Sequence, residues 1–219
     1  MYSKLTNTLQ FIQSRPAIGI VILSAFYFFG IIGIQSEAAK WFIEKTAFNL
    51  LLSLVILLTY QQTFNFRLWI GFLFCYFIGF FAEYLGVTYG ILFGSYEYPD
   101  TLGIQWNGVP VIIGVNWFLL TFCIWALMRK TSFSPAFLII PATILTVLVD
   151  ILIEPVAISL NFWQWENNTV PLQNYVGWGF ISFLIFSFYA LIRIPTDNKI
   201  YWALLAWQII FFASLNFLL

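Results

Sequence analysis

The sequence predicts an all-α polytopic transmembrane bundle of about seven helices, forming a single integral membrane domain over residues 1–219. Hydrophobic residues make up 62% of the chain and charged residues 8%, whereas a soluble globular domain has about 45–50% and about 25%. So few charged side chains do not cover the outside of a water-soluble protein of this size. The second observation is a series of uncharged segments, each close to the roughly 20 apolar residues that a spanning helix needs.

The helix boundaries follow from these apolar segments and from the prolines beside them. Pro16, Pro110 and Pro135 lie near expected helix starts, and Pro195 follows an expected helix end. We therefore expect helices near residues 17–35, 43–60, 67–87, 109–128, 135–156, 176–193 and 200–218.

The distribution of Lys and Arg predicts the orientation of this bundle. With seven crossings, the N-terminus and the segments after the second, fourth and sixth helices share one side of the membrane. That side carries Lys4, Arg15, Arg67, Arg129, Lys130, Arg193 and Lys199, and the other side carries only Lys40 and Lys45. Because basic residues accumulate on the cytoplasmic side, we expect a cytoplasmic N-terminus and an external C-terminus in a bacterial cytoplasmic membrane. The nine basic and nine acidic residues cancel, which gives no electrostatic reason for a nucleic-acid partner.

The residue types that are missing exclude several kinds of site. The chain has no histidine, which excludes His-ligated haem, copper and zinc, the His-rich di-iron centres of membrane hydroxylases and a His-based catalytic triad. Cys75 and Cys123 lie inside apolar segments, where we expect buried free thiols. We therefore expect a site without a metal and without a cofactor.

Three carboxyl groups remain at membrane depth: Glu83, Asp150 and Glu154. Asp150 and Glu154 are four residues apart and share one helical face, and Glu83 lies late on a helix that runs in the same direction. All three therefore converge on the outer half of the bilayer, where no Lys or Arg is expected to pair with them. Ionisable residues at this depth usually have a functional role. The alternative is that they only hydrogen-bond between helices as packing contacts.

An internal repeat surrounds these acids. Glu83 and Asp150 are each followed thirteen residues later by an aromatic-x-aromatic pair, then by a Val-Pro dipeptide, and seven residues after the proline by a tryptophan. These elements are Tyr96 and Tyr98 with Val109-Pro110 and Trp117, and Trp163 and Trp165 with Val170-Pro171 and Trp178. The spacing predicts parallel repeat units over residues 79–128 and 146–193, of the kind related by an axis along the membrane normal.

The repeat predicts one cavity between its two units, lined by the acids and the aromatic side chains. The lid on its outer side would be formed by Tyr96, Tyr98, Trp163 and Trp165, and Asn116 and Asn174 would hold a water molecule there. The alternative for each tyrosine and tryptophan is a place in the aromatic belt at the membrane interface.

Protonated carboxylic acids in such a cavity are suited to general-acid chemistry on a hydrocarbon. Protonation of a carbon–carbon double bond gives a tertiary carbocation, which aromatic faces stabilise. Capture by water gives a tertiary alcohol, and capture by an internal alkene gives a ring. The residues alone leave both outcomes open.

Several segments resemble the carotenoid 1,2-hydratase family of small membrane proteins, over about residues 79–180. They are Glu83-Tyr84-Leu85-Gly86, Phe93-Gly94-Ser95-Tyr96-Glu97-Tyr98, Gly108-Val109-Pro110, Asn116-Trp117, Asp150-Ile151-Leu152-Ile153-Glu154-Pro155-Val156-Ala157 and Trp163-Gln164-Trp165. The resemblance implies a hydro-lyase that adds water across the terminal double bond of an acyclic, lycopene-like carotenoid, with other carotenoid biosynthesis enzymes as candidate partners. We expect Asp150 to protonate C2 of the end group and Glu154 or Glu83 to act as its partner.

Three alternatives to a hydratase each have a feature that distinguishes them. A lycopene-cyclase-like enzyme would use the same acids and give a monocyclic product. A proton-coupled transporter also keeps intramembrane acids, but it would move its substrate unchanged. A retinal-binding photoreceptor needs a lysine in the middle of the last helix, whereas Lys199 lies at its start.

Overall fold

A computed structural model describes residues 11–219, and it confirms an all-α bundle of apolar helices. The elements that these residues form are α2 (Pro16–Ile34), α3 (Ala39–Glu44), α4 (Thr46–Thr59), α5 (Phe66–Tyr89), α6 (Ile113–Met128), α7 (Pro135–Ser159), α8 (Leu172–Ile192) and α9 (Tyr201–Leu218). The strands are four pieces of two residues each, in the segments that follow α5 and α7.

Every predicted helical segment overlaps one of the longer helices, and the short helix α3 was not predicted as a separate element. Among them α2, α5, α7, α8 and α9 are long and apolar enough to cross a membrane, and α4 and α6 are shorter, with 14 and 16 residues. The prediction of an integral membrane protein is therefore confirmed, and the exact number of seven crossings stays a prediction.

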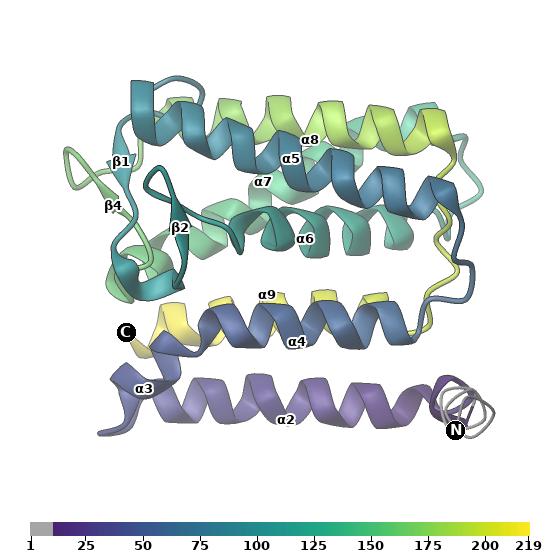
Figure 1. The fold of residues 1–219 in the computed structure, drawn as a ribbon, viewed down its shortest axis with the longest axis horizontal. Helices are drawn as coiled ribbons and strands as arrows, with labels where there is room; N and C mark the ends of the chain where they lie inside the picture. Colours follow the sequence, from purple (N-terminus) through teal and green to yellow (C-terminus); the bar gives the residue numbers. More distant parts are fainter. Residues whose placement is uncertain (1–10) are drawn as a thin grey trace.

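Consecutive long helices run in opposite directions (Figure 1). Helices α5 and α8 pack against each other at the top of the view, α6 lies below them with α7 farther back, and α2 forms the opposite face. Between these layers, α9 contacts both α2 and α6, and α4 runs alongside it. The bundle thus has an inner group, α5 to α8, and an outer group, α2, α4 and α9.

The basic residues separate between the two ends of this bundle. Arg15 precedes α2 and Arg129 follows α6, at the end of the bundle where the described chain begins, whereas Lys40 and Lys45 lie at the other end, beside α3. Lys4 lies outside the described residues. The orientation of the termini relative to a membrane stays a prediction.

Two predicted helix starts differ from the structure by four residues, and the second helix begins at Thr46 instead of residue 43. The fourth helix begins at Ile113 instead of residue 109, because β3 (Val109–Pro110) pairs with β2 (Gln105–Trp106) in a hairpin. Its two-residue turn, Asn107-Gly108, has φ values of 49° and 79°, as the tight type I′ turn requires. The sixth helix begins at Leu172, directly after Pro171, instead of residue 176.

A second strand pair connects the two halves of the inner group. Strand β1 (Tyr96–Glu97) pairs antiparallel with β4 (Gln164–Trp165), so that Tyr96 lies opposite Trp165. This pairing holds the loop after α5 against the loop after α7, at the end of the bundle where the three membrane-depth acids lie.

Candidate active site

Glu83, in the last two turns of α5, is surrounded by hydrogen-bond donors. Its Oε2 atom accepts hydrogen bonds from the hydroxyl of Tyr98 at 2.8 Å and from the hydroxyl of Tyr96. Its Oε1 atom accepts one from the indole Nε1 of Trp117 at 3.0 Å. The carboxyl group is buried, so these donors replace the water that it would otherwise bind.

The two tyrosines remain neutral donors. Burial, followed by the charge of Glu83 when that group is ionised, raises the pKa of Tyr96 and of Tyr98 well above the usual value for a phenol. A neutral phenol can donate a hydrogen bond, and it can also accept one if its neighbour becomes protonated.

Glu154, late on α7, has a different set of donors. Its Oε2 atom accepts hydrogen bonds from the indole Nε1 atoms of Trp163 and Trp165, both at 3.0 Å. Its Oε1 atom accepts one from Nδ2 of Asn174 at 3.1 Å. All three donors are N–H groups, which cannot accept a proton in return. This environment is suited to an ionised carboxylate.

Asp150 lies behind Asn174. The same Nδ2 atom of Asn174 donates to Asp150 Oδ2 at 2.8 Å, so one amide bridges the two acids of α7. The other oxygen, Asp150 Oδ1, has no hydrogen-bond partner among residues 11–219, and the side chain is fully buried. Within the same residues, the only ion pair joins Lys40 to Glu44, so none of the three acids is paired with a cation.

Two glycines on α5 allow the aromatic donors to approach Glu83. A Cβ atom on Gly79 would lie 2.5 Å from Cγ of Trp117, and one on Gly86 would lie 2.8 Å from the Tyr96 ring. Any larger residue would therefore displace the side chain that donates to Glu83. Trp117 in turn stacks on Trp178 of α8, with ring centroids 4.0 Å apart.

Glu83 and Glu154 border a small space, which we call the acid cavity. It has a volume of about 20 Å³ and is lined by Glu83, Glu154, Asn116, Asn174 and aromatic or aliphatic side chains. A space of this size holds about one water molecule. Its lining includes all the predicted site residues except Asp150 and Trp117, and each of these two contacts a residue of the lining.

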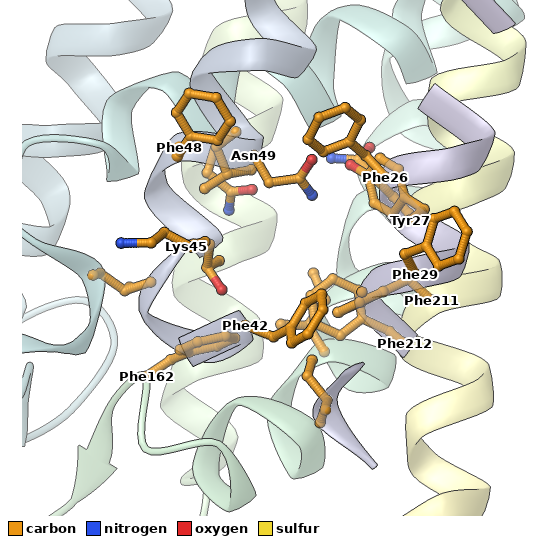
Figure 2. A pocket seen from close by; sticks show the side chains of 18 of the residues that line it. Phe26, Tyr27, Phe29, Phe42, Lys45, Phe48, Asn49, Phe162, Phe211 and Phe212 are labelled. Atoms are coloured by element: carbon orange, nitrogen blue, oxygen red, sulfur yellow. The ribbon is translucent and has the colours of Figure 1, made fainter. Parts of the chain in front are cut away.

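A much larger cavity, the aromatic chamber (Figure 2), shares lining residues with the acid cavity. It has a volume of about 650 Å³, and its walls come from α2, α3, α4, α6, α7 and α9. Ile113, Asn116 and Trp163 line both spaces. Phenyl rings from four helices surround the chamber, among them Phe29, Phe42, Phe48 and Phe211.

Aromatic contacts join the two predicted repeat units across the inner group. Tyr96 packs on Trp165 with ring centroids 4.9 Å apart, and Tyr98 packs on Trp163 at 6.0 Å. In the two units, Tyr96 corresponds to Trp163 and Tyr98 corresponds to Trp165. If the units are exchanged, the contact of Tyr96 with Trp165 becomes the contact of Tyr98 with Trp163. The stack of Trp117 on Trp178 is unchanged by the exchange. A pseudo-two-fold axis would give this pattern, although the duplication itself stays a prediction.

Sequence reasoning missed several residues of these two cavities. Phe93 and Ile113 line the acid cavity. Phe93 belongs to a segment that carries the family resemblance, but it was not chosen as a site residue in a chain with 21% aromatic residues. Asn49 and Gln208 line the aromatic chamber. These two had a usable signal, because each is an uncharged polar residue inside a predicted span.

Comparison with known proteins gives two matches. The family described as carotenoid biosynthesis protein matches residues 45–218. A bisanhydrobacterioruberin hydratase from Haloarcula japonica is 33% identical over 119 residues, which are 48% of this chain and 40% of that relative. This chain thus matches less than half of the relative's length. No solved structure matches the chain.

Proposed function

This chain belongs to the carotenoid biosynthesis protein family, and from that premise we propose that it is a carotenoid hydratase. The reaction is the acid-catalysed addition of water to the terminal (1,2) double bond of an acyclic, lycopene-like end group, and it gives a tertiary alcohol. One observation carries the proposal: two carboxyl groups face a space for one water, and this space adjoins an apolar chamber. Hydration needs an acid, a base, one water and a dry binding site for the alkene.

We assign the proton donor to Glu83. A protonated Glu83 has neighbours that can respond, because the phenols of Tyr96 and Tyr98 accept a hydrogen bond as readily as they donate one. Transfer of its proton to C2 forms the new C–H bond and leaves positive charge at C1. The indole faces beside the cavity, those of Trp163 and Trp178, stabilise this cation.

We assign the base to Glu154, whose three N–H donors suit the ionised form. In this proposal the reacting water occupies the acid cavity, whose lining includes Glu154 and the amides of Asn116 and Asn174. Its oxygen bonds to C1 while one of its protons passes to Glu154. Return of that proton to Glu83 restores both acids, so the net change is the addition of one water molecule.

Asp150 acts through Asn174 in this proposal. The sequence-based assignment of Asp150 as the proton donor stays a prediction, and its position outside the lining of the acid cavity favours an indirect role. By holding the Nδ2 atom of Asn174, Asp150 orients the amide that faces both Glu154 and the water.

The test is expression in a lycopene-accumulating bacterial host, followed by the mass of the pigments. We expect a product heavier by one water, lost in Glu83→Gln and Glu154→Gln and retained in Glu97→Gln, a matched change at an exposed acid on β1. A product of unchanged mass but altered retention would instead indicate cyclisation. Unchanged lycopene in cells that contain the folded protein would contradict the proposal.

A further inference from the structure

Three residues form the border between the acid cavity and the aromatic chamber. Ile113, Asn116 and Trp163 line both spaces. Ile113 has no polar side-chain atom, and the indole Nε1 of Trp163 already donates to Glu154 at 3.0 Å. Asn116 makes no side-chain hydrogen bond within residues 11–219, and neither polar atom of its amide is fully buried. Among the described border residues, Asn116 therefore carries the free polar group.

Asn174, the other amide in the lining of the acid cavity, is already engaged. Its Nδ2 atom donates to Asp150 Oδ2 at 2.8 Å and to Glu154 Oε1 at 3.1 Å, so both of its N–H bonds are used. Its side chain is only 2% exposed. The amide of Asn116 keeps both a donor and an acceptor available. The two asparagines that the sequence grouped together thus differ in what they can bind.

The border is where the reacting carbon has to meet the water. In the proposed reaction the hydrocarbon reaches the acids from the chamber, and the water occupies the acid cavity. A water molecule in such a space needs about two to four polar partners. Glu154 on α7 and Asn116 on α6 supply partners from two sides of the cavity lining. A water bound to both is in place when the cation forms at C1.

Without that water, the same cation has other outcomes. A methyl group on C1 can lose a proton to Glu154: the C–H bond breaks, and its electron pair forms a new double bond to C1. The product is an isomer of the starting alkene. Attack by an internal alkene gives a ring instead. Neither route adds oxygen, so the availability of the water decides which product follows from one protonation step.

We infer that Asn116 is the positioning residue that directs the cation to hydration, because it holds the water at the border between the acid cavity and the aromatic chamber. The inference rests on the proposed function and adds to it a residue that determines the product. Glu83 delivers the proton, and Asn116 sets the ratio of the alcohol to products without oxygen.

Product ratios in deuterium oxide test the inference. Membranes that contain the full chain are incubated with lycopene, and the carotenoids are separated and weighed by mass spectrometry. Each protonation by Glu83 places one deuterium on C2, because carboxyl protons exchange with the solvent. In Asn116→Leu we expect the ratio of alcohol to deuterated isomer or ring to fall about tenfold. The total of deuterated molecules should fall less than about twofold, since Glu83 keeps its three donors.

Two further variants separate the amide from its bulk and from a general effect of substitution. Asn116→Ala removes the amide without a larger side chain and should shift the product ratio in the same direction. Asn167→Leu, at an exposed asparagine in the turn after β4, is the matched control and should leave the ratio and the total unchanged.

An unchanged ratio in Asn116→Leu and Asn116→Ala would overturn the inference. So would an equal fall of the alcohol and of total deuteration, which is the result of a purely structural defect. Either can occur while the unchanged protein still forms the alcohol, in which case the proposed function stands and the role of Asn116 fails. If the unchanged protein forms no alcohol, the proposed function fails and the inference fails with it.

Discussion

The acid cavity encloses about 20 Å³ between two carboxyl groups, whereas the aromatic chamber beside it encloses about 650 Å³ between phenyl and aliphatic side chains. In the acid cavity, each glutamate accepts three hydrogen bonds from side chains held by close packing. In the chamber, two amides have unpartnered oxygens within the described residues. Under the proposed function, the small polar space would perform the chemistry and the larger apolar space would bind the hydrocarbon.

The largest effect should come from Glu154→Gln, which removes the base and leaves the chamber intact. We expect the rate of hydration to fall by about 10²–10⁴, the usual contribution of a general acid or base. The affinity for a carotenoid should stay within about twofold, because the chamber does not include Glu154. Turnover in membrane fractions and fluorescence quenching measure the two quantities separately.

Glu166→Gln, at an exposed acid in the same loop as Trp163, is the matched control and should behave as the unchanged protein. A loss of affinity as large as the loss of rate in Glu154→Gln would show that the two spaces do not divide chemistry from binding.

Asp150→Asn should have a smaller effect than Glu154→Gln. The substituted amide still has an oxygen that accepts from Asn174, so the bridge between the two residues is weakened and not lost. We expect the rate to fall by about tenfold, the free energy of roughly one hydrogen bond. If Asp150→Asn were as severe as Glu154→Gln, Asp150 would be the direct proton donor, as the sequence alone suggested.

Replacing a glycine by alanine should affect the stability of the protein differently in the two regions. Gly79→Ala places a Cβ 2.5 Å from Trp117, a fully buried side chain beside the acid cavity, and overpacking of this kind costs about 1–3 kcal/mol. Gly30→Ala, in the chamber wall, meets only Phe211 at 3.4 Å and should be neutral or slightly stabilising. The measurement is the melting temperature of each variant in detergent. Equal losses of melting temperature in the two variants would contradict the expected difference between the two regions.

The smallest effect concerns alkaline pH and the two phenols of the acid cavity. The pKa values of Tyr96 and Tyr98 are raised in the folded protein by burial and by Glu83. Their contribution to stability is therefore complete below the unfolded pKa of about 10 and is lost as pH rises above it. The melting temperature of the unchanged protein should fall between neutral pH and a pH of about 11. The fall should be smaller in the double variant Tyr96→Phe, Tyr98→Phe, which lacks both phenols. An identical loss would show that these phenols do not titrate with unfolding.

The helices and most of the acid cavity were accessible from the sequence because their signals are strong. Uncharged segments marked the spans, and Glu83, Asp150 and Glu154 stood out as ionisable residues in apolar surroundings. The thirteen-residue spacing from Glu83 identified Tyr96 as an aromatic donor to that acid. The same spacing from Asp150 identified Trp163, but Trp163 donates to Glu154. The acids are a strong signal because an ionisable side chain at membrane depth costs free energy, so such residues are rare and usually functional.

The aromatic chamber was not accessible in the same way. Its walls come from α2, α4 and α9 as well as the inner group, and no periodicity in the sequence says which phenylalanines of these helices face inward. The hairpin of β2 and β3 and the pairing of β1 with β4 were also missed, because two-residue strands leave no alternating pattern. The hydrogen-bonded link between Asp150 and Glu154 runs through a single amide, that of Asn174. The sequence does not reveal this bridge, because it depends on how the side chains are placed in space.

The origin of the oxygen in the product tests the central claim most directly. Membranes that contain the protein are incubated with the carotenoid in water enriched in heavy oxygen, and the product is analysed by mass spectrometry. Addition of the water held in the acid cavity predicts one heavy oxygen in each new hydroxyl group, whether or not air is present. A product whose oxygen comes from molecular oxygen, or a product without new oxygen, would contradict the account.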